Sequence, residues 1–283
     1  MNRIPKQTLI KDGEGIPFIT GISYNSSCDE LFLADYANKV VREMRLHDNA
    51  SDLFDVYRAP HDKTSLVRSV CHMSESDTLL VCSIEDVPDQ KEANWQVAMS
   101  RNGSEWREAQ RVQTDGIGVM CCALNDSQAL IGEYSSTYME MIRVESGPRI
   151  VRVHRIHVPE AYCWFAARCG SGTDIFVAMS YWDESVRVHR LRGNRLKELA
   201  RIQLKGPSYL LWLADRLLVA EWDEYKKSVV VIELEVINKQ LERRRQLIST
   251  SEHVNVRSWC AVDEGIAIFD RDSEDILHYN LFV

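Results

Sequence analysis

Carboxylates recur where short hydrophobic runs of this sequence end. The residues that close six such runs are Asp35, Ser83, Glu133, Met179, Glu221 and Asp270, and Asp183 and Asp223 lie in turns close by. If these run ends gather on one face, their oxygens could bind a hard cation such as Ca²⁺, which takes six to eight oxygen ligands. The same carboxylates could bind a basic partner. A third alternative is that each one accepts backbone N–H bonds in its own turn.

Aromatic side chains accompany the carboxylates and would be the contact anchors if the surface binds a partner. They are Tyr36, Tyr134, Tyr181, Trp182 and Trp222. Large aromatic residues dominate the binding energy of protein interfaces. The partner-binding residues that we predict are Tyr36, Glu133, Tyr134, Trp182, Asp183, Trp222 and Asp223.

Motifs for catalysis or for a tightly bound group are missing from the sequence. It has no Gly-x-Ser-x-Gly elbow and no glycine-rich phosphate loop. His154 and His157 are three residues apart, but no Cys or Glu spacing completes a zinc set. Cys121 and Cys122 are adjacent, so on a strand they point to opposite faces and pack rather than share a metal. We predict no catalytic residue, no metal ligand and no cofactor.

The hydrophobic runs that carry these residues are evenly spaced. They begin at residues 31, 79, 130, 175, 217 and 266, so that consecutive runs are 42 to 51 residues apart. A strand-rich period of this length is typical of a β-propeller, in which each repeat is a four-stranded blade. We therefore predict an all-β fold, a six-bladed β-propeller with four antiparallel strands per blade.

Each period reads as four strands. The first is apolar and small, and the second is the near-continuous hydrophobic run, which indicates burial on both faces. The third alternates, and the fourth is the most polar, as suits an exposed sheet edge. The predicted blades span residues 17–59, 64–113, 117–158, 161–205, 207–250 and 255–283 within a single domain, 1–283. The last period stops after its third strand, so we expect residues 7–11 to supply the fourth and thereby close the ring.

Two segments resemble known blade repeats. The segment from Leu31 to Val41 resembles the NHL-type repeat, with an Asp at the end of its second strand and then a turn that contains Asn and a basic residue. The segment from Tyr181 to Val188 resembles a WD40 repeat at the turn before its third strand. The Gly-His that opens many WD40 repeats is absent. Six periods resemble NHL-like or YWTD-like rings, and such families act mostly as interaction platforms, with a minority of metal-dependent lactonases and peptide-processing lyases.

The function that we predict is therefore a protein-binding platform, a scaffold or adaptor, which contacts its partner through one rim of the propeller. The sequence features favour a binding protein over an enzyme. The alternative is a metal-dependent hydrolase of the lactonase type. A subunit whose outer blade surface docks into a larger complex is a further alternative.

Composition restricts the class of partner. The formal net charge of −8 repels phosphate backbones, so we expect no nucleic acid and favour a basic protein or peptide. No stretch approaches the roughly 18 apolar residues that a membrane-spanning helix needs, and we expect no membrane partner. The first 15 residues lack the apolar core of a secretory signal. These features predict a cytoplasmic protein, with a nuclear location left open.

Overall fold

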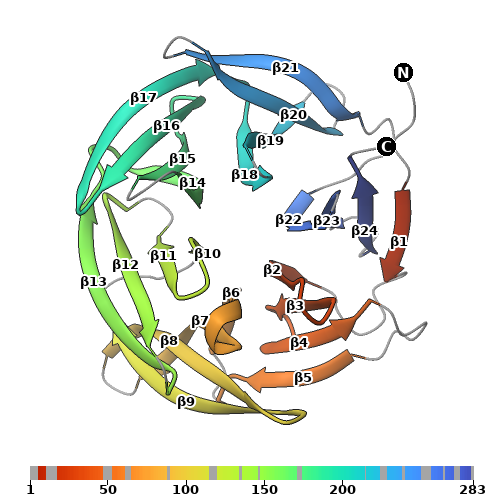
Figure 1. Cartoon of the computed structure of the whole chain (residues 1–283), viewed down its shortest axis with the longest axis vertical. Coiled ribbons are helices and arrows are strands. Elements are labelled where there is room, and N and C mark those ends of the chain that lie inside the picture. Colours follow the sequence, from red (N-terminus) through yellow and green to blue (C-terminus); the bar gives the residue numbers. More distant parts are fainter. Residues whose placement is uncertain are drawn as a thin grey trace. The chain divides into compact units, whose positions relative to one another are not determined.

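The hydrophobic runs form the second strands of six four-stranded antiparallel sheets (Figure 1). The fold is an all-β, six-bladed β-propeller, as the period predicts. The computed structural model describes residues 6–10, 18–46, 53–60, 65–87, 90–114, 120–133, 136–145, 147–170, 174–213, 215–223, 228–237, 240–249, 256–263, 265–270 and 275–281.

The first three blades follow one another along the chain. Blade 1 consists of β2 (Ile19–Asn25), β3 (Glu30–Asp35), β4 (Val40–Arg45) and β5 (Leu53–Arg58). Blade 2 consists of β6 (Leu66–Met73), the short 3-10 helix η1 (Ser74–Ser76), β7 (Thr78–Val87), β8 (Gln90–Asn102) and β9 (Glu105–Thr114). Blade 3 consists of β10 (Met120–Ala123), β11 (Gln128–Gly132), β12 (Tyr138–Glu145) and β13 (Arg149–His157).

The remaining blades repeat this order. Blade 4 consists of β14 (Tyr162–Cys169), β15 (Ile175–Tyr181), β16 (Ser185–Arg192) and β17 (Arg195–Gln203). Blade 5 consists of β18 (Pro207–Leu213), β19 (Arg216–Asp223), β20 (Ser228–Ile237) and β21 (Gln240–Ser249). Blade 6 consists of β22 (Val256–Val262), β23 (Gly265–Asp270), β24 (Asp275–Asn280) and β1 (Lys6–Ile10).

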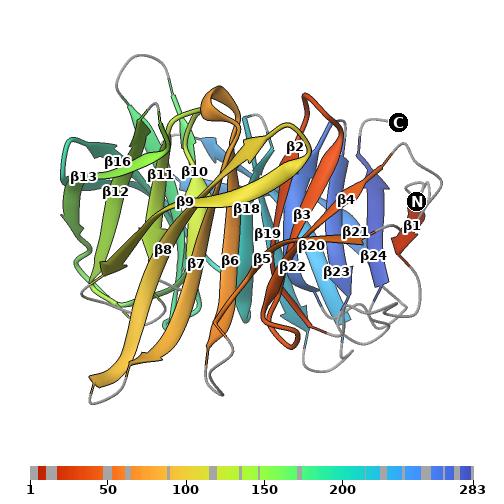
Figure 2. The same ribbon diagram turned by 90° about the horizontal axis from the view of Figure 1, so that it is seen from below.

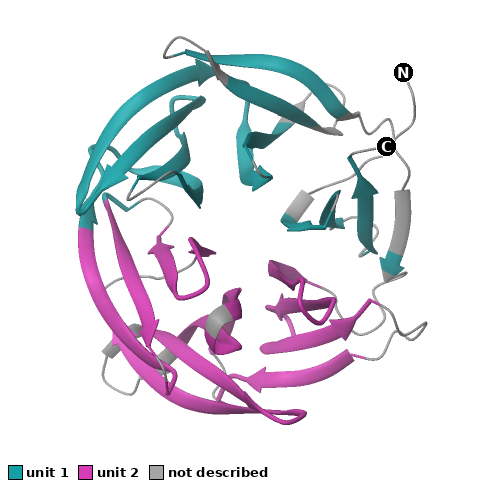
Figure 3. Ribbon diagram, in the orientation of Figure 1, with its two compact units in different colours: residues 1–13, 135–137, 156–283 teal, residues 14–134, 138–155 magenta. Residues whose placement is uncertain are grey.

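The chain divides into two compact units (Figure 3). Unit 1 comprises residues 1–13, 135–137 and 156–283 and contains blades 4 to 6. Unit 2 comprises residues 14–134 and 138–155 and contains blades 1 to 3, apart from the last two residues of β13.

The N-terminal strand pairs with the last blade. β1 runs antiparallel to β24, with Lys6 opposite Tyr279 and Thr8 opposite Leu277. This strand lies one residue earlier than the segment 7–11 that the sequence predicts. It supplies the fourth strand that blade 6 would otherwise lack. The closure of the ring through this pairing stays a prediction.

Within each unit, apolar cores lie between neighbouring blades, and the second strand of the middle blade contributes to two cores at once. In β19, Leu217 and Val219 pack toward blade 4, whereas Leu218 and Ala220 pack toward blade 6. Successive side chains of a strand point to opposite faces, so a strand between two blades must be apolar at every position. This requirement explains why the second strands read as unbroken hydrophobic runs.

The expected loop of blade 2 is a hairpin instead. The polar, acidic composition of residues 85–94, with one proline, predicts a mobile loop between the second and third strands. The structure extends β7 and β8 into this segment, where Glu85 pairs with Ala93 and Val87 with Gln90 (Figure 2 shows the length of these strands). Backbone pairing needs no apolar side chain, so the composition was a poor guide here.

The first strands of blades 1 and 2 come close together at Gly21. A Cβ atom at this position would lie 2.9 Å from the Cα of Ser69 on β6. The hydroxyl of Thr20 also donates a hydrogen bond to the carbonyl of Val67 across the same contact, at 3.3 Å. Glycine is therefore required here by the approach of two backbones.

Candidate functional site

The turn that joins the second and third strands of blade 4 presents the strongest candidate surface. Trp182, Asp183 and Glu184 connect β15 to β16, and Glu184 adopts a left-handed conformation with φ of 60°. The N–H of Glu184 donates to the carbonyl of Tyr181 at 3.2 Å, and its own carbonyl accepts the N–H of Leu204 at 2.8 Å. These backbone bonds fix the turn against the end of β17.

Asp183 is held by hydrogen bonds within its own turn. Its Oδ1 accepts the backbone N–H of Ser185 at 3.1 Å and the hydroxyl of the same residue, while its Oδ2 accepts from Arg187 at 2.7 Å. The bond from the Ser185 hydroxyl, followed by the one from Arg187, lowers the pKa of Asp183. The carboxylate therefore stays charged, and one of its roles is to shape the turn.

Arg187 supports the turn from beneath. Its guanidinium donates to Glu160 at 3.0 Å and to Asp183 at 2.7 Å, and it lies 4.2 Å from the ring centroid of Tyr181. The Arg187 side chain is only 10% exposed. The bond to Glu160 is the largest cause of the raised pKa of Arg187, and burial opposes it. This arginine stays charged and holds two carboxylates in place.

A buried tyrosine and histidine complete the support. The Tyr181 hydroxyl lies 2.9 Å from Nε2 of His189, and both residues are buried. Burial, followed by the positive charge of Arg187, lowers the pKa of His189 to about 4. Burial also raises the pKa of Tyr181. The expectation that Tyr181 is a contact anchor is therefore wrong, because its ring lies under the turn rather than on the surface.

Trp182 is the most exposed large hydrophobic side chain in the part of the chain that the structure describes, with 59% of its surface accessible. Its neighbours at the surface are acidic: the side chains of Asp183 and Glu160 are 53% and 58% exposed, and Glu184 is exposed too. Arg187, the cation that binds Asp183 and Glu160, is buried. The turn therefore presents an indole flanked by carboxylates.

In the corresponding turn of blade 1, the carboxylate and the aromatic ring are more buried than in blade 4. Asp35 is fully buried and accepts bonds from the backbone N–H of Asn38 at 3.0 Å and from its side-chain amide at 2.8 Å. Tyr36 is half-buried, with the Arg68 guanidinium 4.9 Å from its ring centroid and the Phe18 ring against it. For Asp35, as for Asp183, the alternative of hydrogen bonding within the turn is confirmed.

The other predicted residues are placed only in part. Glu133 directly follows β11 and is half-buried, and Tyr134 lies outside the described residues. Trp222 and Asp223 are the last two residues of β19, but their side chains lie outside the description. Within unit 1 the structure thus places Trp182 and Asp183 on one turn, and Trp222 and Asp223 at the matching strand end of blade 5. The binding role of all seven residues stays a prediction.

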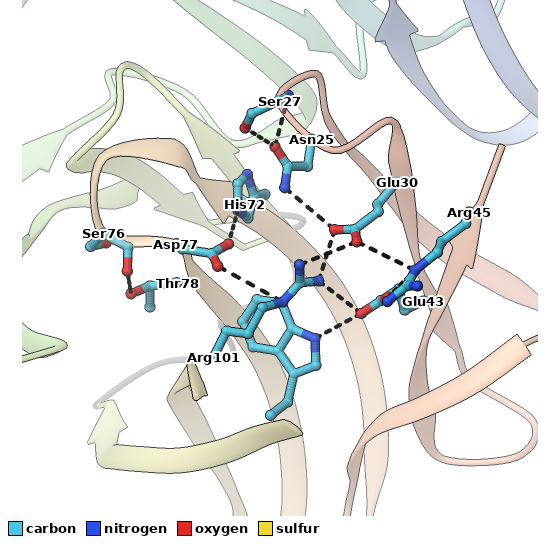
Figure 4. Close-up of polar contacts among 11 residues, drawn as sticks. Asn25, Ser27, Glu30, Glu43, Arg45, His72, Ser76, Asp77, Thr78 and Arg101 are labelled. Carbon is cyan, nitrogen blue, oxygen red and sulfur yellow. Dashed lines mark hydrogen bonds and ion pairs between the residues drawn. The ribbon is translucent and has the colours of Figure 1, made fainter. Parts of the chain in front are cut away.

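A second polar cluster joins blades 1 and 2 inside unit 2 (Figure 4). Arg101 on β8 donates to Glu30 at 2.7 Å and to Glu43 at 2.9 Å, and both carboxylates are buried. The Trp106 indole N–H also donates to Glu43, at 2.8 Å, and Arg101 lies over the same ring. Burial opposes the charge of Arg101, but the bonds and charges of Glu30 and Glu43 outweigh it and raise the arginine pKa.

The edge of this cluster contains a histidine and an aspartate. Nε2 of His72 lies 3.0 Å from Oδ1 of Asp77, and the His72 ring stacks on Phe32. Asp77 follows η1 with a left-handed backbone and lies 3.8 Å from Arg101. Every charged group named here has an oppositely charged neighbour, so we interpret the cluster as a joint between two blades rather than as a binding site.

Sequence reasoning missed both supporting networks. Arg187 and Glu160 are 27 residues apart, and Arg101 and Glu30 are 71 residues apart. One available signal was that Glu30 directly precedes the apolar run that begins at Leu31, where a buried charge needs a partner.

The described residues contain no group of three or more His, Cys, Asp or Glu side chains arranged to hold a metal ion. Among the same residues, no helix is long and apolar enough to cross a membrane.

Comparisons with known proteins identify the fold alone. No family model matches the sequence, and no curated protein matches it. Among solved structures, a putative oxidoreductase (glucose dehydrogenase) from Thermus thermophilus is 11% identical with a TM-score of 0.64, covering 98% of this chain and 99% of that one. A chain of a mitotic checkpoint complex is 8% identical with a TM-score of 0.64, covering 99% and 95%. Virginiamycin B lyase from Staphylococcus aureus is 11% identical with a TM-score of 0.57, covering 99% and 100%.

These structural neighbours are propeller proteins, in agreement with the predicted resemblance. Most of them are enzymes, and one belongs to a multiprotein complex. The same fold therefore accompanies different functions, and function has to be argued from the residues of this chain.

Proposed function

We propose that this protein is a non-enzymatic interaction platform of the cytoplasm, which binds a basic protein or peptide through the turn between the second and third strands of blade 4 and the matching strand end of blade 5. The observation that carries the proposal is the 59% exposure of Trp182 on a turn that hydrogen bonds hold rigid. A preorganised turn loses little conformational entropy on binding, so the burial of an indole there yields more net affinity.

The chemistry of the turn favours a partner that contains arginine or lysine. A cation can lie over the face of an indole, and the attraction is strongest for tryptophan. Carboxylates of Glu160, Asp183 and Glu184 are exposed beside Trp182, whereas Arg187 is buried below them. An approaching guanidinium would thus meet an aromatic face and acidic groups together.

Selection from a random peptide display library tests this proposal without knowledge of the natural partner. The immobilised wild-type protein should enrich peptides that contain arginine or lysine, and Trp182→Ala should not retain them. Phe54→Ala is a matched control, because Phe54 is an exposed aromatic residue of unit 2, 51% accessible. Enrichment that survives Trp182→Ala but not Phe54→Ala would overturn the assignment of the surface.

The alternative function is a metal-dependent hydrolase, and it predicts a bound metal ion that stabilises the fold, which the platform does not require. A resident metal stabilises the folded state by mass action, so its removal lowers the melting temperature. Elemental analysis of the purified protein, together with melting curves in the presence and absence of EDTA, decides between them. A stoichiometric metal and an EDTA-sensitive melting temperature would favour the hydrolase over the platform.

A further inference from the structure

Three cysteine thiols meet where blades 2 and 3 pack together in unit 2. Cys71 on β6 and Cys82 on β7 belong to the apolar core between these blades, and Cys121 on β10 packs against the same core. In the β6–β7 register, Cys71 lies opposite Leu80 and Ser69 lies opposite Cys82. Residues two apart and residues opposite each other share a face of a sheet, so Ser69, Cys71 and Cys82 all face β10.

The Ser69 hydroxyl orients Cys121. Its Oγ accepts the backbone N–H of Cys121 at 3.2 Å and lies 3.1 Å from the Sγ of the same residue. Because the oxygen already accepts the amide hydrogen, its own hydrogen can be donated to the sulfur. A hydroxyl donor at this distance favours the thiolate over the thiol.

The neighbouring thiols act in the same direction. Hydrogen bonds from Cys71 and then Cys82, with a smaller one from Ser69, lower the pKa of Cys121 well below its usual range although burial opposes this. The pKa values of Cys71 and Cys82 are raised, chiefly because each donates to Cys121 and further because both are buried. The directions of these shifts favour Cys121 over its two neighbours as the thiol that loses its proton first.

We propose that Cys121 is an oxidation site for peroxides and that Cys71 resolves the oxidised form into a disulfide between blades 2 and 3. The Cys121 thiolate attacks one oxygen of hydrogen peroxide, the O–O bond breaks, and the products are a sulfenic acid and water once the leaving hydroxide is protonated. The sulfur of Cys71 then attacks the Cys121 sulfur, an S–S bond forms, and the second oxygen leaves as water.

The exposure of the cysteines and the strands that β10 contacts assign the attack on peroxide to Cys121 and the resolving role to Cys71. Cys121 is partly exposed, whereas Cys71 and Cys82 are 4% and 0% exposed, so peroxide reaches Cys121 more readily. β10 lies mainly alongside β6 and touches β7 less, which favours Cys71 over Cys82 as the residue whose backbone is near enough for a disulfide. Cys122 alternates to the other face of β10 and takes no part.

Peptide mapping of the folded protein after treatment with hydrogen peroxide tests the proposal directly. The mapping uses a Cys28→Ser/Cys169→Ser background, which removes the two exposed cysteines and with them intermolecular disulfides. Cleavage after glutamate separates Cys71 from Cys82 at Glu75, and fragmentation of the peptide distinguishes Cys121 from Cys122. We expect a Cys71–Cys121 pair that dithiothreitol reverses. A linkage through Cys82 or Cys122, or no oxidation at Cys121, would overturn it.

Two variants separate the steps. In Cys71→Ser the sulfenic acid should persist, so that dimedone labels Cys121 more strongly than in the wild type. In Cys121→Ser both the label and the disulfide should disappear. Cys163→Ser is the control, because Cys163 lies in unit 1 and burial raises its pKa to about 11. If Cys121→Ser fails to fold, mapping of the Cys28→Ser/Cys169→Ser background, in which Cys121 is intact, still decides the question. Equal dimedone labelling of Cys71→Ser and the wild type would contradict the resolving role of Cys71.

Discussion

The guanidinium of Arg187 bridges Glu160 and Asp183, 3.0 Å from one carboxylate and 2.7 Å from the other. The bridge joins the segment before β14 to the turn that carries Trp182, although the two are far apart in the sequence. A single buried side chain thus determines how the exposed indole and its acidic neighbours are presented.

Arg187→Gln should destabilise the protein by about 1–3 kcal/mol, because hydrogen bonds to two charged groups are lost. It should also weaken peptide binding, since Asp183 loses one of its fixed partners. Arg201→Gln is the control: Arg201 lies on β17 of the same blade, its side chain is 71% exposed, and its contact with Glu198 is 4.0 Å long. Urea denaturation of both variants checks the comparison, and equal losses would contradict the special role of Arg187.

His189 should make the protein less stable below neutral pH. Its folded pKa of about 4 lies below the ordinary value of 6.5, so the unfolded chain binds the proton first as pH falls. The unfolding free energy should therefore fall from pH 6.5 to pH 4 by up to about 3 kcal/mol, and remain flat for this group outside that window.

His189→Gln should flatten this dependence, although it also changes the contact with Tyr181. His154→Gln serves as the control, because His154 is exposed on β13. The measurement is urea denaturation at several pH values. If His189→Gln and the wild type lose stability in parallel between pH 6.5 and 4, the neutral buried state of His189 is wrong.

Removal of Arg101 alone should cost more stability than removal of Arg101 together with the charges of Glu30 and Glu43. Arg101→Leu leaves the buried Glu30 and Glu43 with only the partly exposed Arg45 as a cation, 3.7 Å and 3.3 Å away. The loss should be at the lower end of about 3–5 kcal/mol. Glu30→Gln and Glu43→Gln added to Arg101→Leu should recover part of this loss, because no buried charge is then stranded. Arg107→Leu, at an arginine that is 67% exposed, should change stability little. A triple variant that is less stable than Arg101→Leu alone would contradict the account.

Gly21→Ala should destabilise the contact between blades 1 and 2. The added methyl group would lie 2.9 Å from the Cα of Ser69 and 3.1 Å from the amide nitrogen of Val70, and neither backbone atom can rotate away. Overpacking of this kind costs about 1–3 kcal/mol. A melting temperature equal to that of the wild type would show that β2 and β6 separate without cost.

The fold was predictable because burial dictates composition in a propeller. Residues 217–220 are apolar at every position since β19 packs against a blade on each side. The sequence pattern places the fourth strand of blade 1 at residues 53–58, and β5 spans the same residues. The β7–β8 hairpin was missed because its pairing depends on the backbone and not on side-chain polarity.

The sequence predicted the candidate site only where its residues are neighbours along the chain. Trp182 and Asp183 are adjacent in the sequence, and the turn that they occupy has its own residue signature. The role of Tyr181 depends on His189 and on Arg187 above its ring, so the tyrosine could not be recognised as buried. The position of Glu30 next to an apolar run shows that it needs a partner, but the sequence does not show that this partner is Arg101, 71 residues away.

The most direct test of the proposed platform is calorimetric titration of a selected basic peptide into the wild type, Trp182→Ala and Phe54→Ala. A central aromatic contact typically contributes 2 kcal/mol or more, so Trp182→Ala should bind about 30-fold more weakly or worse, whereas Phe54→Ala should bind like the wild type. Equal affinity of Trp182→Ala and the wild type would contradict the central claim.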